Sequence, residues 1–340
     1  MRDSEPWLAT VLPVLNEEEH IEACLRSLIQ QTLPASEHVI VVLDGGSKDS
    51  TKEIVENICA GLDATKHPAI HLLDNPGRFV PHARNLALQK LPESVTHVLE
   101  FNGHIEIETN HLLRMKETWN RLNNQHPQLA GLGCRVIGFD ASQSTIESII
   151  DATLRNPLGG SSGQFASFRE EGSTNVPAFA LHLRSALDAV GGWDESFLTS
   201  QDSDLSMRLV KSGYQLFRTP DVVVRMRRRT SFKSWFLMSH RYGFWRTKVL
   251  LKHPRRLVLR ELFPLIGIVA TSILLFLHPT WALLPIAMYG AVLLLSGLAN
   301  AKKGIAHFLG VPFSLLLLHT GFTLGLVDGL FRKGRASRDR

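Results

Sequence analysis

Apolar runs alternate with amphipathic stretches along the first hundred residues. Four runs are each long enough for one buried strand: "LATVLPVL" (8–15), "HVIVVLD" (38–44), "AIHLLDN" (69–75) and "THVLEF" (96–101). After the first run, Ile21, Leu25 and Leu28 recur at helical spacing, and Asn16 is expected to cap that helix. Strands that alternate with helices predict an α/β fold with an open, mostly parallel sheet.

A polar side chain stands at the end of each predicted strand. These residues are Asn16, Asp44, Asn75 and Asn102. One of them alone would be an ordinary turn residue. The carboxyl ends of parallel strands meet at one edge of a sheet, where such folds bind ligands. The four together favour a nucleotide-binding cleft.

The last third of the chain contains three long apolar stretches, at 262–278, 281–299 and 305–330. Each has about the length of a bilayer-spanning helix, roughly 17–25 residues. The alternative is three buried helices of a soluble domain. Three such stretches in succession are unusual in a soluble chain, so we expect transmembrane helices.

Basic residues gather just before these stretches. From Arg208 to Arg260 there are about 15 Lys and Arg and a single acid, Asp221, so the net charge of +5 hides an acidic remainder. Nucleic acid attracts such a block, but its position beside apolar stretches favours anionic membrane lipids or a phosphorylated lipid. We therefore expect lipid partners and no nucleic acid.

The distribution of charge also predicts an orientation. The basic block and Lys302–Lys303 would face the cytoplasm, and the uncharged loop "HPTW" would face outward. The tail "FRKGRASRDR" disagrees, because three full crossings would place it outside. A re-entrant or interfacial third segment stays open. We expect a multi-pass protein of the cell (inner) membrane with its catalytic domain in the cytoplasm, where Cys24, Cys59 and Cys134 would be reduced thiols.

Several motifs resemble one enzyme family. "VLPVLNEEEHIEACLRSL", "VVLDGGSKDST", "NPGRFVPHARNLAL" and "GGWDESF…QDSDLSMRLVKSGY" are similar, in order and spacing, to the inverting family 2 glycosyltransferases of GT-A fold. "NPGR" and the apolar C-terminal part are most similar to the succinoglycan-type exopolysaccharide branch. The resemblance covers about residues 7–250 and implies a UDP- or GDP-sugar donor.

The resemblance also implies donor-binding residues. Asp44, in an exposed cleft, would bond the nucleotide base, which a strand-end carboxylate beside Gly45 and Gly46 suits on chemical grounds. Turn capping by Asp44 is the alternative. The remaining implied donor residues are Pro13, Asn16 and Glu17 around the base, Asn102, and Arg78 and Arg84 near the phosphates. Either arginine could instead be a surface residue.

"GGWDESFLTSQDSDL" corresponds to the part of the family that carries the base of inverting transfer. The family's Glu-Asp pair reads Gln201-Asp202 here, which makes Asp202 the predicted base. Asp204 would stand near the acceptor and supply the missing negative charge. Either Asp could instead cap the following helix. Trp193 is expected near the acceptor, with a place in the core as the alternative.

Asn102 and His104 stand where the family has D-x-D, or D-x-H in the similar branch. Imidazole is a competent ligand for Mn²⁺ and a poor one for Mg²⁺, and a neutral amide oxygen is weak for both. Three interpretations stay open. His104 is the protein ligand of a weakened Mn²⁺ or Mg²⁺ site, or arginines bind the diphosphate without metal, or the chain has lost catalysis.

"HRYGFWR" (240–246) departs from the Q-x-x-R-W motif of chain-extending members. A single addition therefore fits better than polymerisation, with Arg241 and Trp245 as acceptor contacts on an interfacial helix. We expect a GT-A domain at 1–230, basic interfacial helices at 231–260, transmembrane helices at 261–330 and a basic tail at 331–340. The expected function is transfer of one sugar to a lipid-linked acceptor. The alternatives are a polyprenyl-phosphate sugar transferase and a catalytically weak scaffold.

Overall fold

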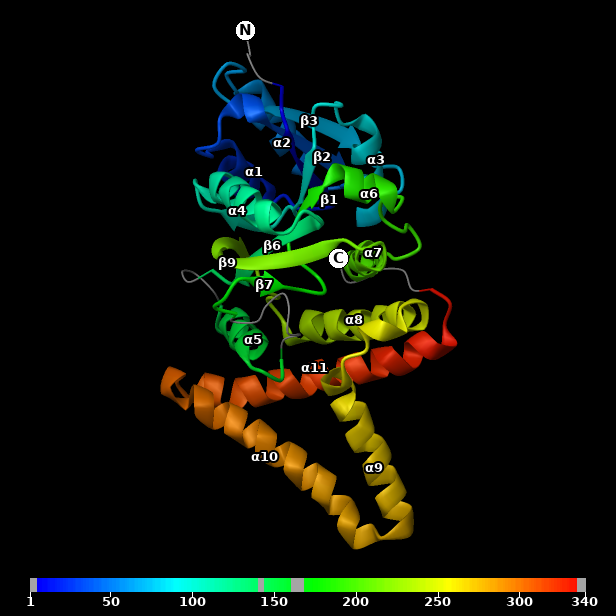
Figure 1. Ribbon diagram of the computed structural model, residues 1–340. Helices are drawn as coiled ribbons and strands as arrows, with labels where there is room; N and C mark the ends of the chain where they lie inside the picture. Colours follow the sequence, from blue (N-terminus) through cyan, green and yellow to red (C-terminus); the bar gives the residue numbers. More distant parts are fainter. Residues whose placement is uncertain (1–4, 140–143, 160–167, 335–340) are drawn as a thin grey trace. The chain divides into compact units, whose positions relative to one another are not determined.

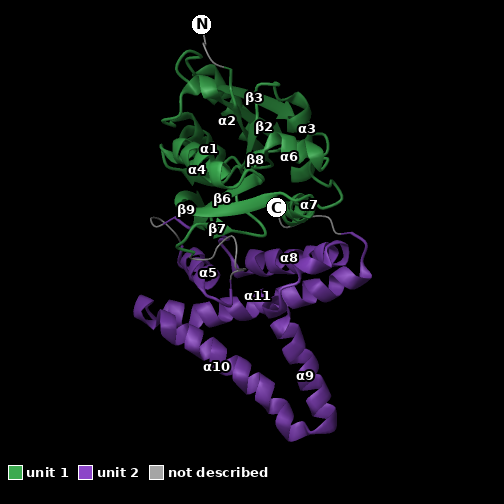
Figure 2. Ribbon diagram, viewed as in Figure 1, with its two compact units in different colours: residues 1–137, 167–227 green, residues 138–166, 228–340 purple. Residues whose placement is uncertain are grey.

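The computed structural model describes residues 5–139, 144–159 and 168–334. The chain divides into two compact units (Figure 2). Unit 1 is Met1–Ile137 with Ser167–Arg227, and unit 2 is Gly138–Ala166 with Arg228–Arg340. In this division residues 138–166, predicted within the 1–230 domain, group with the C-terminal part of the chain, and residues 228–340 form one unit with them. Residues 335–340 of the predicted basic tail lie outside the described residues.

The first half of unit 1 is the predicted parallel sheet (Figure 1). Its strands are β1 (Leu8–Val14), β2 (His38–Asp44), β3 (Ala69–Asp74) and β4 (His97–Glu100), in the spatial order β3-β2-β1-β4 with parallel pairing throughout. The intervening helices are α1 (Ile21–Ile29), α2 (Thr51–Ala60) and α3 (Val80–Lys90). The four predicted strands and their direction are confirmed.

The second half of the sheet is mixed. β8 (Leu181–Leu183) pairs antiparallel with β4 and with β6 (Leu129–Ile137), and β6 pairs parallel with β9 (Gln215–Met226). β5 (Ile105–Ile107) and β7 (Gly172–Ser173) add to β9 antiparallel. The helices of this half are α4 (His111–Gln125), α6 (Arg184–Ala189) and α7 (Gln201–Lys211). Together these elements form the mostly parallel, mixed sheet of a GT-A-like domain.

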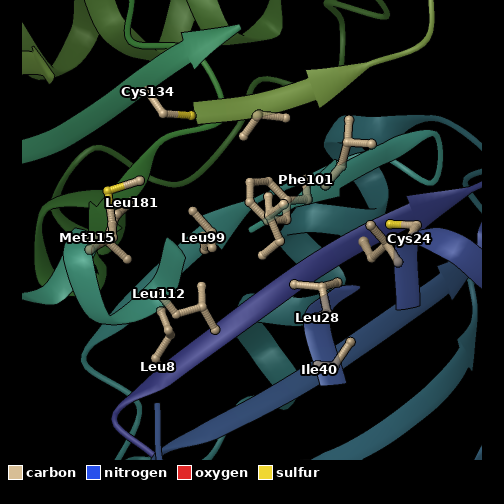
Figure 3. Close-up of a cluster of buried hydrophobic side chains, with 14 of the residues drawn as sticks. Leu8, Cys24, Leu28, Ile40, Leu99, Phe101, Leu112, Met115, Cys134 and Leu181 are labelled. Carbon is tan, nitrogen blue, oxygen red and sulfur yellow. The ribbon is translucent and has the colours of Figure 1, made fainter. Parts of the chain in front are cut away.

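The core of unit 1 lies on both faces of the sheet. Figure 3 shows one cluster, in which Leu8, Leu28, Leu99, Phe101 and Leu112 come together from β1, α1, the end of β4 and α4. Every residue of β2 is buried, as expected for a central parallel strand covered on both faces. Helix α1 starts later than predicted, at Ile21, so Asn16 is not its N-cap.

Unit 2 is helical. Its elements are α5 (Thr145–Arg155), α8 (Phe232–Lys252), α9 (Phe263–Leu277), α10 (Leu283–Asn300) and α11 (Ile305–Phe331), with short 3₁₀ turns between the last four. By length and composition, three helical stretches suffice to cross a membrane: Leu259–Leu277, Pro279–Lys303 and Ile305–Phe331. These match the three predicted apolar segments. The first is unburied within the protein, whereas the third has a large buried share.

Candidate active site

The carboxyl ends of β1 and β2 are tied together by polar contacts. The backbone N–H of Asn16 donates to Ser47 Oγ at 2.9 Å, and Asn16 Oδ1 accepts from the N–H of Lys48 at 2.8 Å. The N–H of Glu17 donates to Thr51 Oγ1 at 2.8 Å. Asn16 therefore joins two loops at the sheet edge. Pro13, one of the predicted base-framing residues, lies within β1 and is partly exposed.

Asp44 ends β2 and supports the turn that follows. Its carboxylate accepts hydrogen bonds from the N–H groups of Gly46 (3.0 Å) and Ser47 (3.1 Å), and the residue is only 2% exposed. Gly46 has φ +85°, a conformation that favours glycine. The expectation of an exposed Asp44 is wrong, since the turn-capping arrangement is present. The carboxylate nevertheless stands at the predicted edge of the sheet.

The loop between β3 and α3 meets this turn. A Cβ at Gly45 would lie 2.5 Å from the carbonyl oxygen of Arg78, so the two loops approach as closely as glycine allows. Arg78 is exposed and has φ +64°. Asn75 is buried and donates from Nδ2 to the carbonyl of Phe79 at 3.2 Å, which makes it a loop anchor. Arg78 is thus an exposed cation next to the Asp44 turn.

The triplet Asn102-Gly103-His104 fills the turn between β4 and β5. His104 Nδ1 lies 2.9 Å from Glu17 Oε1, and both side chains are partly exposed. A Cβ at Gly103 would come within 3.0 Å of Glu17 Cγ, so the turn packs against the loop after β1. Asn102 is partly exposed. Asn75 reaches the same edge, because its N–H donates to the carbonyl of Asp44 at 2.7 Å. All four predicted strand-end positions, with Glu17 and His104, therefore share one edge.

The side chains at this edge suit a metal ion held jointly by the protein and a bound diphosphate better than an ion held by protein ligands alone. Among the described residues, no group of three or more His, Cys, Asp or Glu is placed to hold a metal. The pair that exists suits a single protein ligand, because a carboxylate on one ring nitrogen orients a metal-binding histidine. A diphosphate would have to supply the other ligands.

Arg84, predicted near the phosphates, lies instead in a buried ion pair. Its guanidinium is 2.8 Å from Glu100 Oε2, and Glu100 Oε1 is 2.8 Å from His182 Nε2. All three side chains are almost fully buried. Burial alone would raise the pKa of Glu100, but the Arg84 and His182 charges outweigh it and lower that pKa. The prediction for Arg84 is corrected accordingly: its charge is already balanced within the protein.

Trp193 belongs to the same network and is not exposed to an acceptor. Its ring lies under the Arg84 guanidinium at 5.6 Å and edge-on to the His182 ring at 6.4 Å, and the residue is 2% exposed. Of the two interpretations of Trp193, the core position is therefore the one present. Glu100 ends β4, so the network links the strand before the triplet to the segment that leads to Asp202.

Asn85 is a residue that sequence reasoning missed. Its side chain donates to the carbonyl of Trp193 at 2.8 Å and accepts from the Trp193 N–H at 2.8 Å. It also donates to Glu195 Oε1 at 3.0 Å. Gly192, with φ +69°, lies against Asn85 Oδ1, so a side chain there would collide. Only the position of Asn85 within the motif "PHARN" marked it in the sequence, because its partner Trp193 is 108 residues away.

Asp202 and Asp204 stand in the first turn of α7 but differ in environment. Asp204 is 0% exposed and bonds Arg208 Nε at 2.8 Å. It therefore does not face an acceptor, which corrects its predicted place. Asp202 is partly exposed, and its Oδ1 accepts from the N–H of Ser203 at 2.8 Å. Ser200, and neither Asp, is the N-cap residue.

Backbone strain gathers at these loops. In the described part of the chain, the non-glycine residues with positive φ are Asn16, Arg78, Phe179 and Ser200. Such conformations cost of order 1–3 kcal/mol and cluster at functional sites. Asn16 and Arg78 stand at the sheet edge described above, and Ser200 precedes the predicted base by two residues. The strain is therefore an independent indication that these loops are functional.

Arg241 and Trp245, the predicted acceptor contacts, lie on α8 in unit 2. Arg241 is 1% exposed, with its guanidinium 5.7 Å from the Tyr242 ring centre, and Trp245 is 5% exposed and packs edge-on against Phe244. Both side chains are therefore packed within unit 2, not displayed on the surface of an interfacial helix.

Known protein families and relatives resemble this chain over most of its length. The family model described as "Glycosyl transferase family 2" matches residues 10–191, and that described as "Glycosyl transferase family group 2" matches residues 116–327. The succinoglycan biosynthesis protein ExoA of Rhizobium meliloti is 30% identical over 84% of this chain and 82% of its own length.

A second relative covers nearly the whole chain. The dolichyl N-acetyl-alpha-D-glucosaminyl phosphate 3-beta-D-2,3-diacetamido-2,3-dideoxy-beta-D-glucuronosyltransferase of Methanococcus voltae is 24% identical over 96% of this chain and 98% of its own. Among solved structures, the mannosyltransferase PcManGT of Pyrobaculum calidifontis, in complex with GDP-Man and Mn²⁺, aligns with a TM-score of 0.61 at 18% identity. That alignment covers 98% of this chain and 89% of the other and establishes a shared fold.

Proposed function

The chain belongs to glycosyl transferase family 2, and from this premise we propose that it is a membrane-bound enzyme that moves one sugar from a nucleotide-sugar donor to a lipid-linked acceptor. Relatives that act in polysaccharide and glycoconjugate biosynthesis support the general class. The donor, the acceptor, the base and the membrane topology are our inference.

One observation carries the proposal: the loops after β1, β2 and β4 meet at one edge. Asn16 and Glu17 bond the loop after β2, whose turn Asp44 supports, and Glu17 also contacts His104. Arg78 adds an exposed cation beside the Asp44 turn. A nucleoside diphosphate needs a flat polar rim for its base and positive charge for its phosphates. We assign the base to the Asp44 turn and the diphosphate to the side of Arg78 and His104.

Asp202 is the proposed general base. Its carboxylate would take the proton from an acceptor hydroxyl while that oxygen attacks the anomeric carbon. The bond between the anomeric carbon and the diphosphate oxygen breaks, and its electron pair leaves with the nucleoside diphosphate. Attack from the face opposite the leaving group inverts the configuration. Asp204, which accepts a hydrogen bond from Arg208, instead stabilises the first turn of α7, the turn that carries Asp202.

His104, with Glu17 behind it, would hold a divalent ion shared with the diphosphate. Such an ion would neutralise the charge that develops on the leaving group. Glu17 would keep the imidazole in the orientation in which its other nitrogen binds. The complex of the solved mannosyltransferase with GDP-Man and Mn²⁺ is consistent with this choice. Arg78 would bind the diphosphate on the side away from this ion.

The lipid-linked acceptor is supported by the words "dolichyl N-acetyl-alpha-D-glucosaminyl phosphate" in the name of the Methanococcus relative, which describe a saccharide carried on a lipid phosphate, and by the apolar helices of unit 2. A saccharide carried on a lipid would present its hydroxyl at the cytoplasmic leaflet. The basic segment 208–260 would attract anionic headgroups there.

The test uses the full chain in lipid nanodiscs with a panel of UDP- and GDP-sugars. Two acceptors are compared, polyprenyl phosphate and a polyprenyl-linked saccharide. We expect one sugar to be added to the saccharide hydroxyl with inverted configuration. A product found only on polyprenyl phosphate would identify a lipid-phosphate transferase instead. Nucleotide binding without turnover for every donor would identify a scaffold that has lost catalysis.

A further inference from the structure

Helices α8 and α11 pack backbone against backbone. Gly321, Gly325 and Gly329 of α11 repeat every four residues and face α8. A Cβ at Gly329 would lie 2.6 Å from the carbonyl oxygen of Phe244, and one at Gly321 would lie 2.9 Å from that of Phe236. Glycine at this spacing is typical of helices whose backbones touch. The pair therefore moves as one body.

Hydrogen bonds fix the direction and register of this pair. Trp235 Nε1 donates to the carbonyl of Ser314 at 3.0 Å. Thr247 Oγ1 donates to that of Leu326 at 2.8 Å, and Lys248 Nζ to that of Gly329 at 2.8 Å. The residue numbers rise together, so the helices are parallel, and the N-terminal end of α8 lies beside the middle of α11.

The first half of α11 is covered by α5. His307 Nε2 is 2.9 Å from Ser148 Oγ, and Val311 and Leu315 form a buried cluster with Ile149. Helix α5 carries Asp151, which pairs with Arg228 at 2.8 Å just before α8. One side of α11 is thus covered along its length by helices that contain charged residues.

The opposite side of α11 is apolar and exposed. It presents a stripe of apolar side chains at helical spacing, formed by Leu309, Phe313, Leu316, Leu324, Val327 and Leu330 and interrupted by the exposed Thr320. A helix whose exposed face is apolar, and whose other face is covered by helices that carry charged residues, suits the surface of a membrane. The same stripe would also suit contact with lipid if α11 crossed the bilayer. The distribution of charge must therefore decide between an interfacial and a crossing α11.

The charges of α8 exclude a crossing by α11. Helix α8 contains five Lys or Arg and no acid, and only residues 227–231, "RRRTS", separate it from the last strand of unit 1. If α11 crossed, α8 would be drawn into the hydrocarbon with these charges, and its first turn would lie near mid-bilayer. Ionisable groups are expensive there. A polar catalytic domain tethered by five residues would have to follow.

We propose that α8 and α11 lie together in the headgroup layer of an anionic membrane, and that the chain crosses the bilayer only twice, through α9 and α10. This arrangement places the basic block, Lys302–Lys303 and the basic C-terminus on one side, as the positive-inside rule requires. The loop around Pro279–Ala282, without Lys, Arg, Asp or Glu, is the part on the other side. The inference rests on the proposed membrane attachment but not on the assigned chemistry.

Cysteine labelling tests the topology. Thr280→Cys, Lys303→Cys and Lys333→Cys are made in the full chain, and a membrane-impermeant maleimide is applied to vesicles of both orientations. Native Cys59 in unit 1, partly exposed, marks the side of the catalytic domain. We expect Lys303→Cys and Lys333→Cys to react from the side of Cys59 and Thr280→Cys from the other. Reaction of Lys333→Cys together with Thr280→Cys would overturn the proposal.

A depth profile gives a second, independent measurement. Spin labels at Leu309, Leu316, Leu324 and Leu330, all on the exposed stripe, are compared in vesicles containing anionic lipid. An interfacial α11 predicts similar shallow depths, about 5–10 Å below the headgroups, at all four sites. A maximum of depth at Leu316 and Leu324 would mean a crossing and would refute the inference. Extraction of the parent chain by carbonate would instead refute membrane insertion itself.

Discussion

Asp202 and Asp204 are two residues apart on one helix, yet Asp204 is fully buried and pairs with Arg208, whereas Asp202 is partly exposed. The sequence predicted Asp202 as the base and Asp204 as a second charge near the acceptor, with capping of the helix as the alternative for either. Burial separates them. A general base must meet the acceptor hydroxyl, and a carboxylate with no exposure cannot.

Asp202→Asn is expected to lower transfer by about two to four orders of magnitude, because the amide keeps the shape and cannot accept the proton. Donor binding should remain nearly intact. The measurement is the transfer rate together with the dissociation constant of the nucleoside diphosphate. Asp221→Asn, at an exposed acid on β9, is the matched control and should leave both unchanged. Transfer within tenfold of the parent would remove Asp202 from the mechanism.

Asp44 requires two substitutions, because it both supports a turn and stands at the proposed base site. Asp44→Ala removes the acceptor of the Gly46 and Ser47 N–H groups and should lower the free energy of unfolding by about 1–3 kcal/mol. Asp44→Asn keeps one acceptor oxygen and should largely restore stability while donor binding stays weak. Calorimetric titration with nucleoside diphosphates and thermal unfolding separate the effects. Tight binding by a stable Asp44→Asn would contradict the base assignment.

Metal removal tests the pair of His104 and Glu17. Activity should fall in excess chelator and return more fully with Mn²⁺ than with Mg²⁺, because imidazole suits the softer ion. His104→Ala should abolish the Mn²⁺ preference, and Glu17→Gln should weaken Mn²⁺ affinity about 10- to 100-fold, as loss of an orienting carboxylate does. Electron paramagnetic resonance of bound Mn²⁺ gives a readout besides activity. Full activity in chelator would favour binding of the diphosphate by Arg78 alone.

At the scale of elements, the four parallel strands β1 to β4 were predictable and the strands of the mixed second half of the sheet were not. β1 and β2 are seven-residue apolar runs, whereas β5 and β8 have three residues each and depend on their neighbours for definition. The site shows the same limit. Arg84 was predicted near the phosphates and Trp193 near the acceptor or in the core, but the structure joins these two residues, 109 positions apart, in one buried network with Glu100. No local pattern reveals such a pairing.

The glycine ridge of α11 gives an element-scale prediction. Gly325→Leu would drive a side chain into the backbone of α8 near His240, and Gly325→Ala would already be too large. We expect the α8–α11 pair to separate, with a drop in thermal stability of the detergent-solubilised protein and faster proteolysis within residues 228–260. Gly290→Leu, at an open position on α10, is the control and should leave the thermal stability and the rate of proteolysis unchanged. Equal stability of the two variants would show that the close contact is dispensable.

At the scale of the whole molecule, the proposed function requires one chain to bring a water-soluble donor to an acceptor held in lipid. Unit 1 supplies the sheet edge with its strained loops, and unit 2 supplies apolar helices and a basic segment. The basic segment 208–260 runs from the end of unit 1 into unit 2, and the proposed attraction to anionic headgroups would act on this part of the chain.

The buried histidines of unit 1 make this organisation sensitive to acid. Burial lowers the pKa of His38 to about 3 and the pKa values of His97 and His111 to about 4, because the charged ring would lose its water. All three lie outside the candidate membrane spans. In the unfolded chain each titrates near 6.5. Below that pH the unfolded state therefore binds more protons than the folded state. The stability that the three neutral histidines allow is fully present above pH 6.5, and the free energy of unfolding falls as the pH drops toward 4.

We expect the free energy of unfolding to fall by ~4 kcal/mol per pH unit between about pH 6 and 4, roughly 1.4 kcal/mol for each of the three rings. Thermal unfolding of the detergent-solubilised chain at pH 8, 7, 6 and 5 would show it as a midpoint that is steady above neutrality and drops below. His97→Gln removes one titrating group and should reduce the slope by about a third. His71→Gln, at an exposed position of β3, is the matched control and should leave the slope unchanged. A parent midpoint that stays constant from pH 7 to 5 would mean that these rings accept protons in the folded state, and that the core around β1, β2 and α4 is open to water.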